Sequence, residues 1–189
     1  MPYVPALAQR WFPARTWLRE CAVVASGAAL VAALAQVSVP LHPVPLTGQT
    51  LGVLLVGCWL GCSRGGAALT LYVGAGAAGL PVFAGGAFGL QVLAGTTGGY
   101  LVGFVVSAAL AGFMAEAGLM RTFPRAVPSL FLASVPIHAL GLVWLSRFVP
   151  ERALLDLGFW PFVAFDPLKI GLAAAIVSGT SERTPRARR

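Results

Sequence analysis

The chain has 189 residues, of which 58% are hydrophobic and only 10% are charged, and its net charge is +7. A soluble domain of this size cannot bury so much apolar side chain, because small domains leave much of their surface exposed and normally carry about 25% charged residues. The same numbers exclude an intrinsically disordered chain, and three cysteines are too few for a disulfide-stabilised secreted module. The composition therefore predicts an integral membrane protein.

Three long uncharged runs cover residues 21–63, 65–115 and 126–146. About 20 apolar residues are needed to cross the ~30 Å hydrocarbon core of a bilayer, so the first two runs hold two spans each and the third holds one. A sixth span follows near the C-terminus. The predicted fold is therefore all-α, a bundle of six transmembrane helices. In chain order the predicted spans are 21–39, 48–60, 66–78, 99–118, 127–148 and 159–179.

Proline and glycine mark the connections between these spans. Three prolines between positions 40 and 45 cannot lie in a regular helix, because each removes a backbone donor and restrains the residue before it. The sequence C-S-R-G at 62–65 predicts a tight turn into the third span. The Gly-rich, uncharged stretch 79–98 leads into the fourth span. A short basic connection at 121–125 precedes the fifth.

The arginines orient the bundle. With the N-terminus inside the cell, the inner segments carry ten arginines and the outer segments carry two, Arg147 and Arg152. This asymmetry follows the positive-inside rule and predicts that both termini are cytoplasmic. The chain then divides into a cytoplasmic N-terminal segment (1–20), a membrane domain (21–179) and a basic cytoplasmic tail (180–189). Because membrane insertion accounts for the basic charge, we expect no nucleic-acid partner.

Motifs of catalysis are missing from the sequence. Lys169 is the only lysine and Leu168 precedes it, so no G-x-x-x-x-G-K-[ST] nucleotide-binding loop is present, and neither H-E-x-x-H nor G-x-S-x-G occurs. No second His, Cys or acid stands at metal-ligand spacing from His42 or from His138 in the fifth span. We interpret both histidines as hydrogen-bonded structural residues. We therefore expect no enzymatic activity, no metal site and no cofactor.

Asp166 and Lys169 are the strongest candidates for a binding site. Ionisable side chains within a membrane are costly and mark functional sites. Asp is a good N-cap and Pro is favoured at the first helical position, so a helix should begin at Pro167 and run to about Ser178. Twelve residues give ~18 Å, which places the helix start in the outer half of the bilayer. Alternatively, the two charges satisfy only one another.

The uncharged outer segments supply further groups for a pocket. Such a mixture of hydrogen-bonding and flat apolar side chains suits a small ring system with an amide-like polar edge. The hydrogen-bonding candidates are Thr47, Gln49, Gln91, Thr96 and Thr97, and the aromatic candidates are Tyr72, Phe83, Phe88 and Tyr100. On the first span, Ala25, Ala29 and Ala33 form a ridge of small residues that would allow a helix of another membrane protein to approach closely.

Several motifs in fixed order resemble the BioY family, the biotin-binding S components of energy-coupling-factor transporters. They are P-V-P-L-T-G-Q-T-L-G at 43–52, G-L-P-V-F-A-G-G at 79–86, G-T-T-G-G-Y-L at 95–101, and the Asp166-x-x-Lys169 pair. The resemblance covers about residues 21–179. One position departs from the family pattern, because Thr96 stands where the family usually has Pro.

The resemblance implies six helices, an outward-facing biotin site and a first outer loop that folds over the ligand. It also implies partners in a bacterial-type plasma membrane, namely a transmembrane coupling T component and two ATPase subunits that supply the ATP chemistry. The family's A-x-x-x-A docking motif matches Ala25–Ala29, or Ala29–Ala33 in the next register. Biotin would be the transported ligand. Its predicted ligand-binding residues are Asp166, Lys169, Gln49, Thr47, Tyr72, Phe83, Gln91, Tyr100, Gly85 and Gly86.

Two other functions remain open at this point. The chain could be an S component for a different small vitamin, or an autonomous membrane channel or enzyme. In the biotin interpretation, Asp166 accepts from a ureido N–H, and Lys169 holds Asp166, the ureido oxygen or the carboxylate of the ligand.

Overall fold

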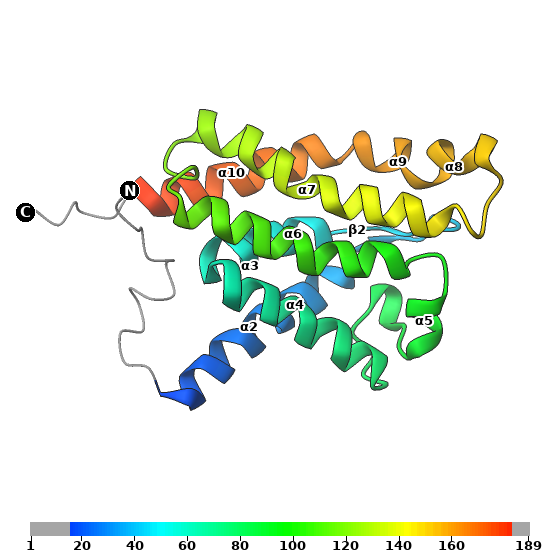
Figure 1. Ribbon diagram of the computed structural model, residues 1–189, viewed down its shortest axis with the longest axis horizontal. Helices are drawn as coiled ribbons and strands as arrows, with labels where there is room; N and C mark the ends of the chain where they lie inside the picture. Colours follow the sequence, from blue (N-terminus) through cyan, green and yellow to red (C-terminus); the bar gives the residue numbers. More distant parts are fainter. Residues whose placement is uncertain (1–15, 183–189) are drawn as a thin grey trace, which may run out of the picture.

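The computed structural model describes residues 16–182, which form a bundle of helices (Figure 1). The predicted features at 1–15 and 183–189 lie outside the described residues. The helices are α2 (Trp17–Ala35), α3 (Gln49–Leu60), α4 (Cys62–Ala77), α5 (Leu90–Ala94), α6 (Gly98–Glu116), α7 (Phe123–Leu145), α8 (Glu151–Gly158), α9 (Trp160–Val163) and α10 (Asp166–Glu182). A 3-10 turn, η1 (Ala84–Gly86), and two short strands, β1 (Ser38–Val39) and β2 (Leu46–Thr47), complete the structure of the described residues.

Each of the six predicted spans contains a helix. Among the described residues, four helical stretches are long and apolar enough to cross a membrane: Trp17–Ala35, Gly98–Glu116, Phe123–Leu145 and Glu151–Thr180. Helices α3 and α4 are shorter, with 12 and 16 residues. Length and composition therefore support a multi-pass membrane protein.

The described residues are mostly helical, as predicted, and they also contain a short β-hairpin in the connection between α2 and α3, which the sequence did not predict. Helix α2 ends at Ala35, four residues before the predicted boundary, and β1 pairs with β2 as an antiparallel hairpin. Ser38 lies opposite Thr47, and Val39 lies opposite Leu46. The prolines between the strands forbid helix, while the β-branched residues beside them favour extended backbone.

Two other predicted connections are shorter than expected. Residues 62–65 form the first turn of α4 rather than a tight turn, because Gly61 alone reverses the chain with a φ of 86°, a conformation that glycine adopts readily. Helix α7 begins at Phe123, within the predicted basic connection. Pro124 is compatible with this start, since the first turn of a helix needs no backbone donor there.

The last helix is longer than predicted. Helix α10 begins at Asp166 and has 17 residues, which correspond to ~26 Å. The predicted twelve-residue length was therefore wrong, and length alone no longer places the start of this helix in the outer half of a bilayer. Asp166 and Lys169 still occupy its first turn, as predicted.

The interior is packed from small and apolar side chains. One buried cluster includes Val31, Leu69 and Phe104, and a second includes Leu54 and Ile170. Helices α6 and α7 approach so closely that a Cβ atom on Gly103 would lie 2.7 Å from the Cα of Ile137. Such close backbone contact is how small residues join helices in lipid.

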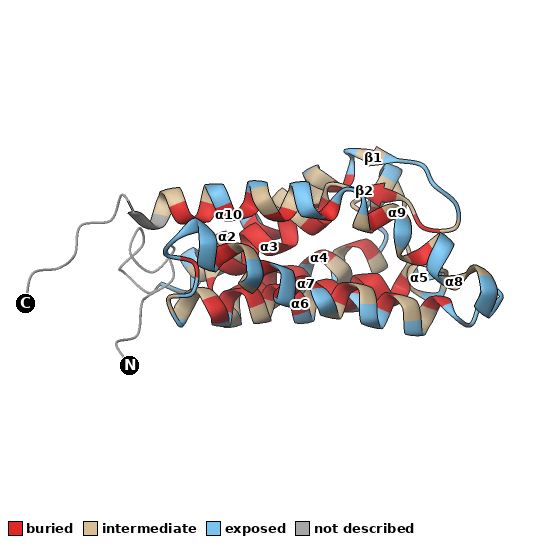
Figure 2. Ribbon diagram, turned by 90° about the horizontal axis from the view of Figure 1, so that it is seen from above, coloured by how far each residue is buried: buried red, intermediate tan, exposed pale blue. Residues whose placement is uncertain are grey.

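Many apolar side chains are exposed on the helices of the bundle. Figure 2 shows exposed and buried residues along the same helices. Val143 is 67% exposed, Phe131 62% and Phe113 60%, and these residues lie on the long helices α6 and α7. A soluble protein rarely exposes an apolar surface of this extent. The exposed side chains therefore fit contact with lipid.

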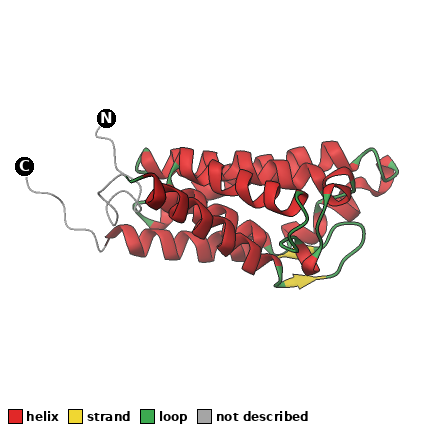
Figure 3. Ribbon diagram, turned by 90° about the horizontal axis from the view of Figure 1, so that it is seen from below, coloured by secondary structure: helices red, strands yellow, loops and turns green. Residues whose placement is uncertain are grey.

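The two ends of the bundle differ. The start of α2, the end of α10 and the α6–α7 connection lie at one end (Figure 1). The β1–β2 hairpin and its loops lie at the other end, together with α5 and α8 (Figures 1 and 3). This second end combines the prolines at 40–45, the Gly-rich stretch 79–98 and the polar uncharged residues of these two segments, and it holds the candidate site.

Candidate ligand-binding site

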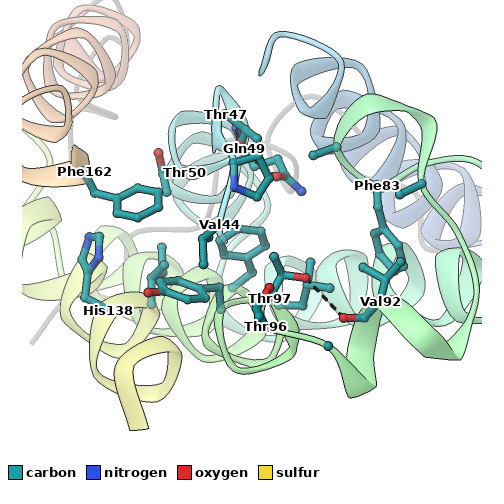
Figure 4. A pocket seen from close by; sticks show the side chains of 18 of the residues that line it. Val44, Thr47, Gln49, Thr50, Phe83, Val92, Thr96, Thr97, His138 and Phe162 are labelled. Carbon is teal, nitrogen blue, oxygen red and sulfur yellow. Dashed lines mark hydrogen bonds between the residues drawn. The ribbon is translucent and has the colours of Figure 1, made fainter. Parts of the chain in front are cut away.

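A cavity of about 330 Å³ lies between the hairpin, the Gly-rich segment and the helices α3, α6, α7, α9 and α10. Figure 4 shows His138 and Phe162 on one side of it, and Phe83 and Val92 on the opposite side. Its lining residues are Val44, Pro45, Thr47, Gln49, Thr50, Phe83, Ala84, Ala87, Gln91, Val92, Gly95, Thr96, Thr97, Tyr100, Leu101, Phe104, Ile137, His138, Phe162 and Lys169. The lining is mostly apolar, with a few polar groups that could orient a ligand, as in small-molecule sites generally.

Aromatic rings form much of the wall. The rings of Tyr100 and Phe162 lie 5.8 Å apart. The Tyr100 hydroxyl donates to the carbonyl oxygen of Gly158 at 2.8 Å. This hydrogen bond occupies the hydroxyl proton and leaves the ring as the flat apolar surface that faces the cavity.

Gln49 is held in place by neighbours on both sides of its amide. Its Nε2 donates to the hydroxyl of Tyr72 at 2.6 Å, and its Oε1 accepts from the Thr47 hydroxyl at 2.7 Å. The Tyr72 hydroxyl in turn donates to the carbonyl oxygen of Val82 at 3.1 Å. An amide nitrogen carries two donors and an amide oxygen two acceptor positions, so Gln49 retains one of each for a ligand.

The ionisable groups gather at the His138 side of the cavity. Lys169 Nζ donates to Asp166 Oδ1 at 3.2 Å and to the Thr50 hydroxyl at 3.0 Å. His138 Nε2 lies 2.7 Å from Asp166 Oδ2. An ammonium group has three donors, so Lys169 keeps one after these two bonds. The buried carboxylate is paired, as a charge inside a protein must be to avoid a large desolvation cost.

The β1–β2 hairpin covers the cavity and is tied to the segments beside it. The Thr96 hydroxyl donates to the carbonyl oxygen of Pro43 in the loop of the hairpin at 2.8 Å. Just before the hairpin, at the end of α2, Gln36 Nε2 donates to the carbonyl oxygen of Phe83 at 3.2 Å. Val44 and Pro45 line the cavity from this loop. Thr96, the position at which the chain departs from the family pattern, thus supplies a hydrogen bond that a proline could not make.

Six of the ten predicted ligand-binding residues line the cavity: Thr47, Gln49, Phe83, Gln91, Tyr100 and Lys169. The other four do not line it. Asp166 lies behind Lys169 and His138, and Tyr72 lies behind Gln49. Gly85 and Gly86 form the η1 turn, where both have positive φ. Phe88, suggested as a further aromatic wall, is half-exposed and also lies outside the lining.

Sequence reasoning missed His138 and Thr50 as neighbours of the charged pair. His138 was assigned a structural hydrogen bond, and the structure gives it one, but the acceptor is Asp166 and the ring also lines the cavity. The sequence did contain a signal for His138, because it is an ionisable side chain inside an apolar span. The same argument identified Asp166 as a candidate. Thr50 carried no such signal.

Comparison with known proteins shows the family to which the chain is similar. The BioY family model matches residues 8–186. The "Biotin transporter BioY" of Thermotoga maritima is 42% identical over 149 residues, which cover 78% of this chain and 87% of that protein. The "Probable biotin transporter BioY" of Pyrococcus horikoshii is 37% identical over 158 residues, covering 84% and 93%.

A solved structure shares the fold. It is described as the S-component for biotin from an ECF-type ABC transporter, and it superposes with a TM-score of 0.78 at 23% identity over 90% of this chain and 96% of that one. The extent of the family match and the identity to the Thermotoga protein, taken together, show that the chain belongs to the BioY family.

Proposed function

We propose that this chain is the membrane-embedded biotin-binding S component of an ECF-type uptake transporter. The observation that carries the proposal is the cavity under the hairpin, with aromatic walls and a buried Lys169–Asp166–His138 group at one side. Family membership and the names of the relatives support biotin as the ligand.

The chemistry of biotin matches this cavity. Its thiophane ring is apolar and suits the aromatic walls of the cavity, which are formed by Phe83 on one side and by Tyr100 and Phe162 on the other. Its ureido group has two N–H donors and one carbonyl acceptor, and its valerate chain ends in a carboxylate. The remaining donor of Lys169 suits either the ureido oxygen or the carboxylate, and the remaining amide positions of Gln49 suit another polar edge.

We further propose six membrane-spanning segments with both chain ends in the cytoplasm. Arg64 lies in the first turn of α4, and Arg121 and Arg125 flank the start of α7, all at connections far from the cavity. Arg147 and Arg152 lie beside the α7–α8 connection at the cavity end. By the positive-inside rule, the cavity end then faces outward, so the protein captures its ligand from outside.

Transport also requires partners, which we propose are a T component and two ATPase subunits that hydrolyse ATP. Helix α2 offers a surface for the T component, because Ala25, Ala29 and Ala33 are exposed while Val31 and Ala35 on the same helix are buried. A row of exposed small residues permits close approach of another helix in lipid.

Isothermal titration of the detergent-purified chain with biotin tests the ligand. Binding without ATP is expected at one site, with a dissociation constant of roughly nanomolar order, which is about −12 kcal/mol. Titrations with thiamine and riboflavin serve as controls. Millimolar affinity for biotin, about −4 kcal/mol, combined with tight binding of another vitamin would assign the cavity to that vitamin instead.

The hairpin should slow the release of biotin. Replacing Thr96 by Val removes the hydrogen bond to Pro43 and keeps the side-chain shape. A neutral hydrogen bond contributes about 0.5–1.5 kcal/mol, so release should become roughly 2- to 12-fold faster. The rate is measured by chasing bound radiolabelled biotin with unlabelled biotin.

Thr97→Val is the matched control, because Thr97 also lines the cavity but its hydroxyl donates to Val92 within its own segment. Its release rate should stay near that of the wild type. An unchanged rate in the Thr96 variant, or equal acceleration in both variants, would contradict a role of the Thr96–Pro43 bond in holding the hairpin closed.

A further inference from the structure

We propose that His138 is a positioning residue for the binding site: it holds the Asp166 carboxylate, which in turn holds the Lys169 ammonium toward the cavity. This inference rests on the proposed function, because it concerns the affinity of the same site for biotin. It extends the site from a pair of residues on one helix to a group of three that joins α7 to α10.

The geometry of the carboxylate is the first step. Asp166 accepts through its two oxygens from two different elements: Oδ1 from Lys169 at 3.2 Å on α10, and Oδ2 from His138 at 2.7 Å on α7. An ionised carboxylate can only accept, so His138 Nε2 carries the proton in this pair. Hydrogen bonds to an ionised group are short and comparatively strong. Two donors on opposite oxygens therefore fix the plane of the carboxylate.

The surroundings of His138 direct its hydrogen bonding to Asp166. The imidazole packs edge-on against Phe159, with 5.8 Å between ring centroids, and beside Phe162 at 5.9 Å. Its other nitrogen, Nδ1, is buried and has no hydrogen-bond partner among residues 16–182. Burying an unpaired polar atom is costly, and an aliphatic side chain would suit these aromatic neighbours better. The Nε2–Asp166 bond is the contribution that an aliphatic side chain could not make.

His138 affects ligand binding through Lys169. The ammonium is held by Asp166 and by the Thr50 hydroxyl, and its third donor is free for the cavity that it lines. Without His138, the carboxylate can rotate on its side chain and the ammonium loses its fixed anchor. The free donor would then no longer be held in one direction, and preorganisation of a binding group is a large part of affinity.

The test compares biotin affinities of His138→Gln and His138→Leu by titration calorimetry. Gln keeps an N–H donor near the position of Nε2, whereas Leu fills similar space without one. We expect Leu to weaken binding about tenfold or more, as the loss of a charge-assisted bond would, and Gln to stay within about threefold of the wild type. A residue that only filled space would show the reverse order, because Leu is the better apolar filler.

A double-mutant cycle with Asp166→Asn tests whether His138 acts through Asp166. Coupled residues give non-additive effects, so His138→Leu should cost less than about threefold in the Asp166→Asn background. All variants are compared after gel filtration shows a single species. If the Leu variant fails to fold, His138→Asn replaces it, since its shorter amide cannot reach the carboxylate.

Three results would overturn the inference: wild-type affinity in the variant without the donor, an equal loss in the Gln variant, or the same loss in both backgrounds. Each of these leaves the proposed function intact as long as the wild-type protein binds biotin. Failure of the wild-type protein to bind biotin would instead reject the proposed function itself.

Discussion

Replacing Lys169 by Met, or Asp166 by Asn, should weaken biotin binding roughly 10- to 150-fold. The estimate follows from the loss of one charge-assisted hydrogen bond, about 1.5–3 kcal/mol. Lys169→Met removes the donor that lines the cavity. Asp166→Asn acts indirectly, because Asp166 lies behind the lining and anchors both Lys169 and His138. A charged side chain within a membrane costs about 2.5–3.5 kcal/mol on insertion scales. A role in ligand binding would explain why the chain keeps two such side chains at this place.

Glu116→Gln is the matched control for these variants. Glu116 also lies in an apolar helix, but it accepts a hydrogen bond from the backbone N–H of Cys62, away from the cavity. Its amide can still accept that bond, so biotin affinity should remain at the wild-type value. Titration of monodisperse samples gives the comparison. Wild-type biotin affinity in the Lys169 variant would show that Lys169 does not contact the ligand, and would assign the polar contacts with biotin to Gln49 and Gln91.

Replacing Ala29 by Trp should abolish copurification with the T component while leaving biotin binding unchanged. The Ala29 side chain is exposed on α2, between Ala25 and Ala33. An indole in the middle of this row would hold a partner helix away from the close contact that small residues permit. The cavity is not affected, because none of its lining residues lies on α2. The measurement is the amount of T component recovered with the tagged chain.

Val106→Trp controls for the bulk of the added ring. Val106 is 44% exposed on α6, so the substitution also places an indole on the outer surface of the bundle. Assembly should survive this change. Loss of biotin binding together with assembly in the Ala29 variant, or retention of assembly, would count against α2 as the docking surface.

The order of the helices could be predicted from the sequence because charged residues are so scarce. The length of each uncharged run fixes how many spans of about 20 residues it can hold. Proline and glycine within the runs mark breaks that lie near the observed helix ends. The predicted boundaries were wrong where a turn depends on one residue or where two distant segments pair. Gly61 alone turns the chain before α4, and the pairing of Ser38 with Thr47 depends on a partner strand beyond a proline loop. Local composition does not reveal such pairing.

Six of the predicted ligand-binding residues line the cavity, but the polar contacts among the site residues were predictable only where they are local. The pairing of Asp166 with Lys169 follows from their spacing of three residues on one helix, and the structure confirms that contact. The contacts of His138 with Asp166 and of Thr96 with Pro43 join residues 28 and 53 positions apart. Hydrogen bonds over such separations depend on how the helices pack, which hydrophobic patterning does not specify.

The most direct measurement is an experimental structure of the purified chain with biotin bound. The expected result is biotin in the cavity beneath the hairpin, with its rings against Phe83, Tyr100 or Phe162 and one of its oxygens within hydrogen-bond distance of Lys169 Nζ. Biotin bound outside this cavity, or within it but without contact to Lys169, would contradict the proposed site.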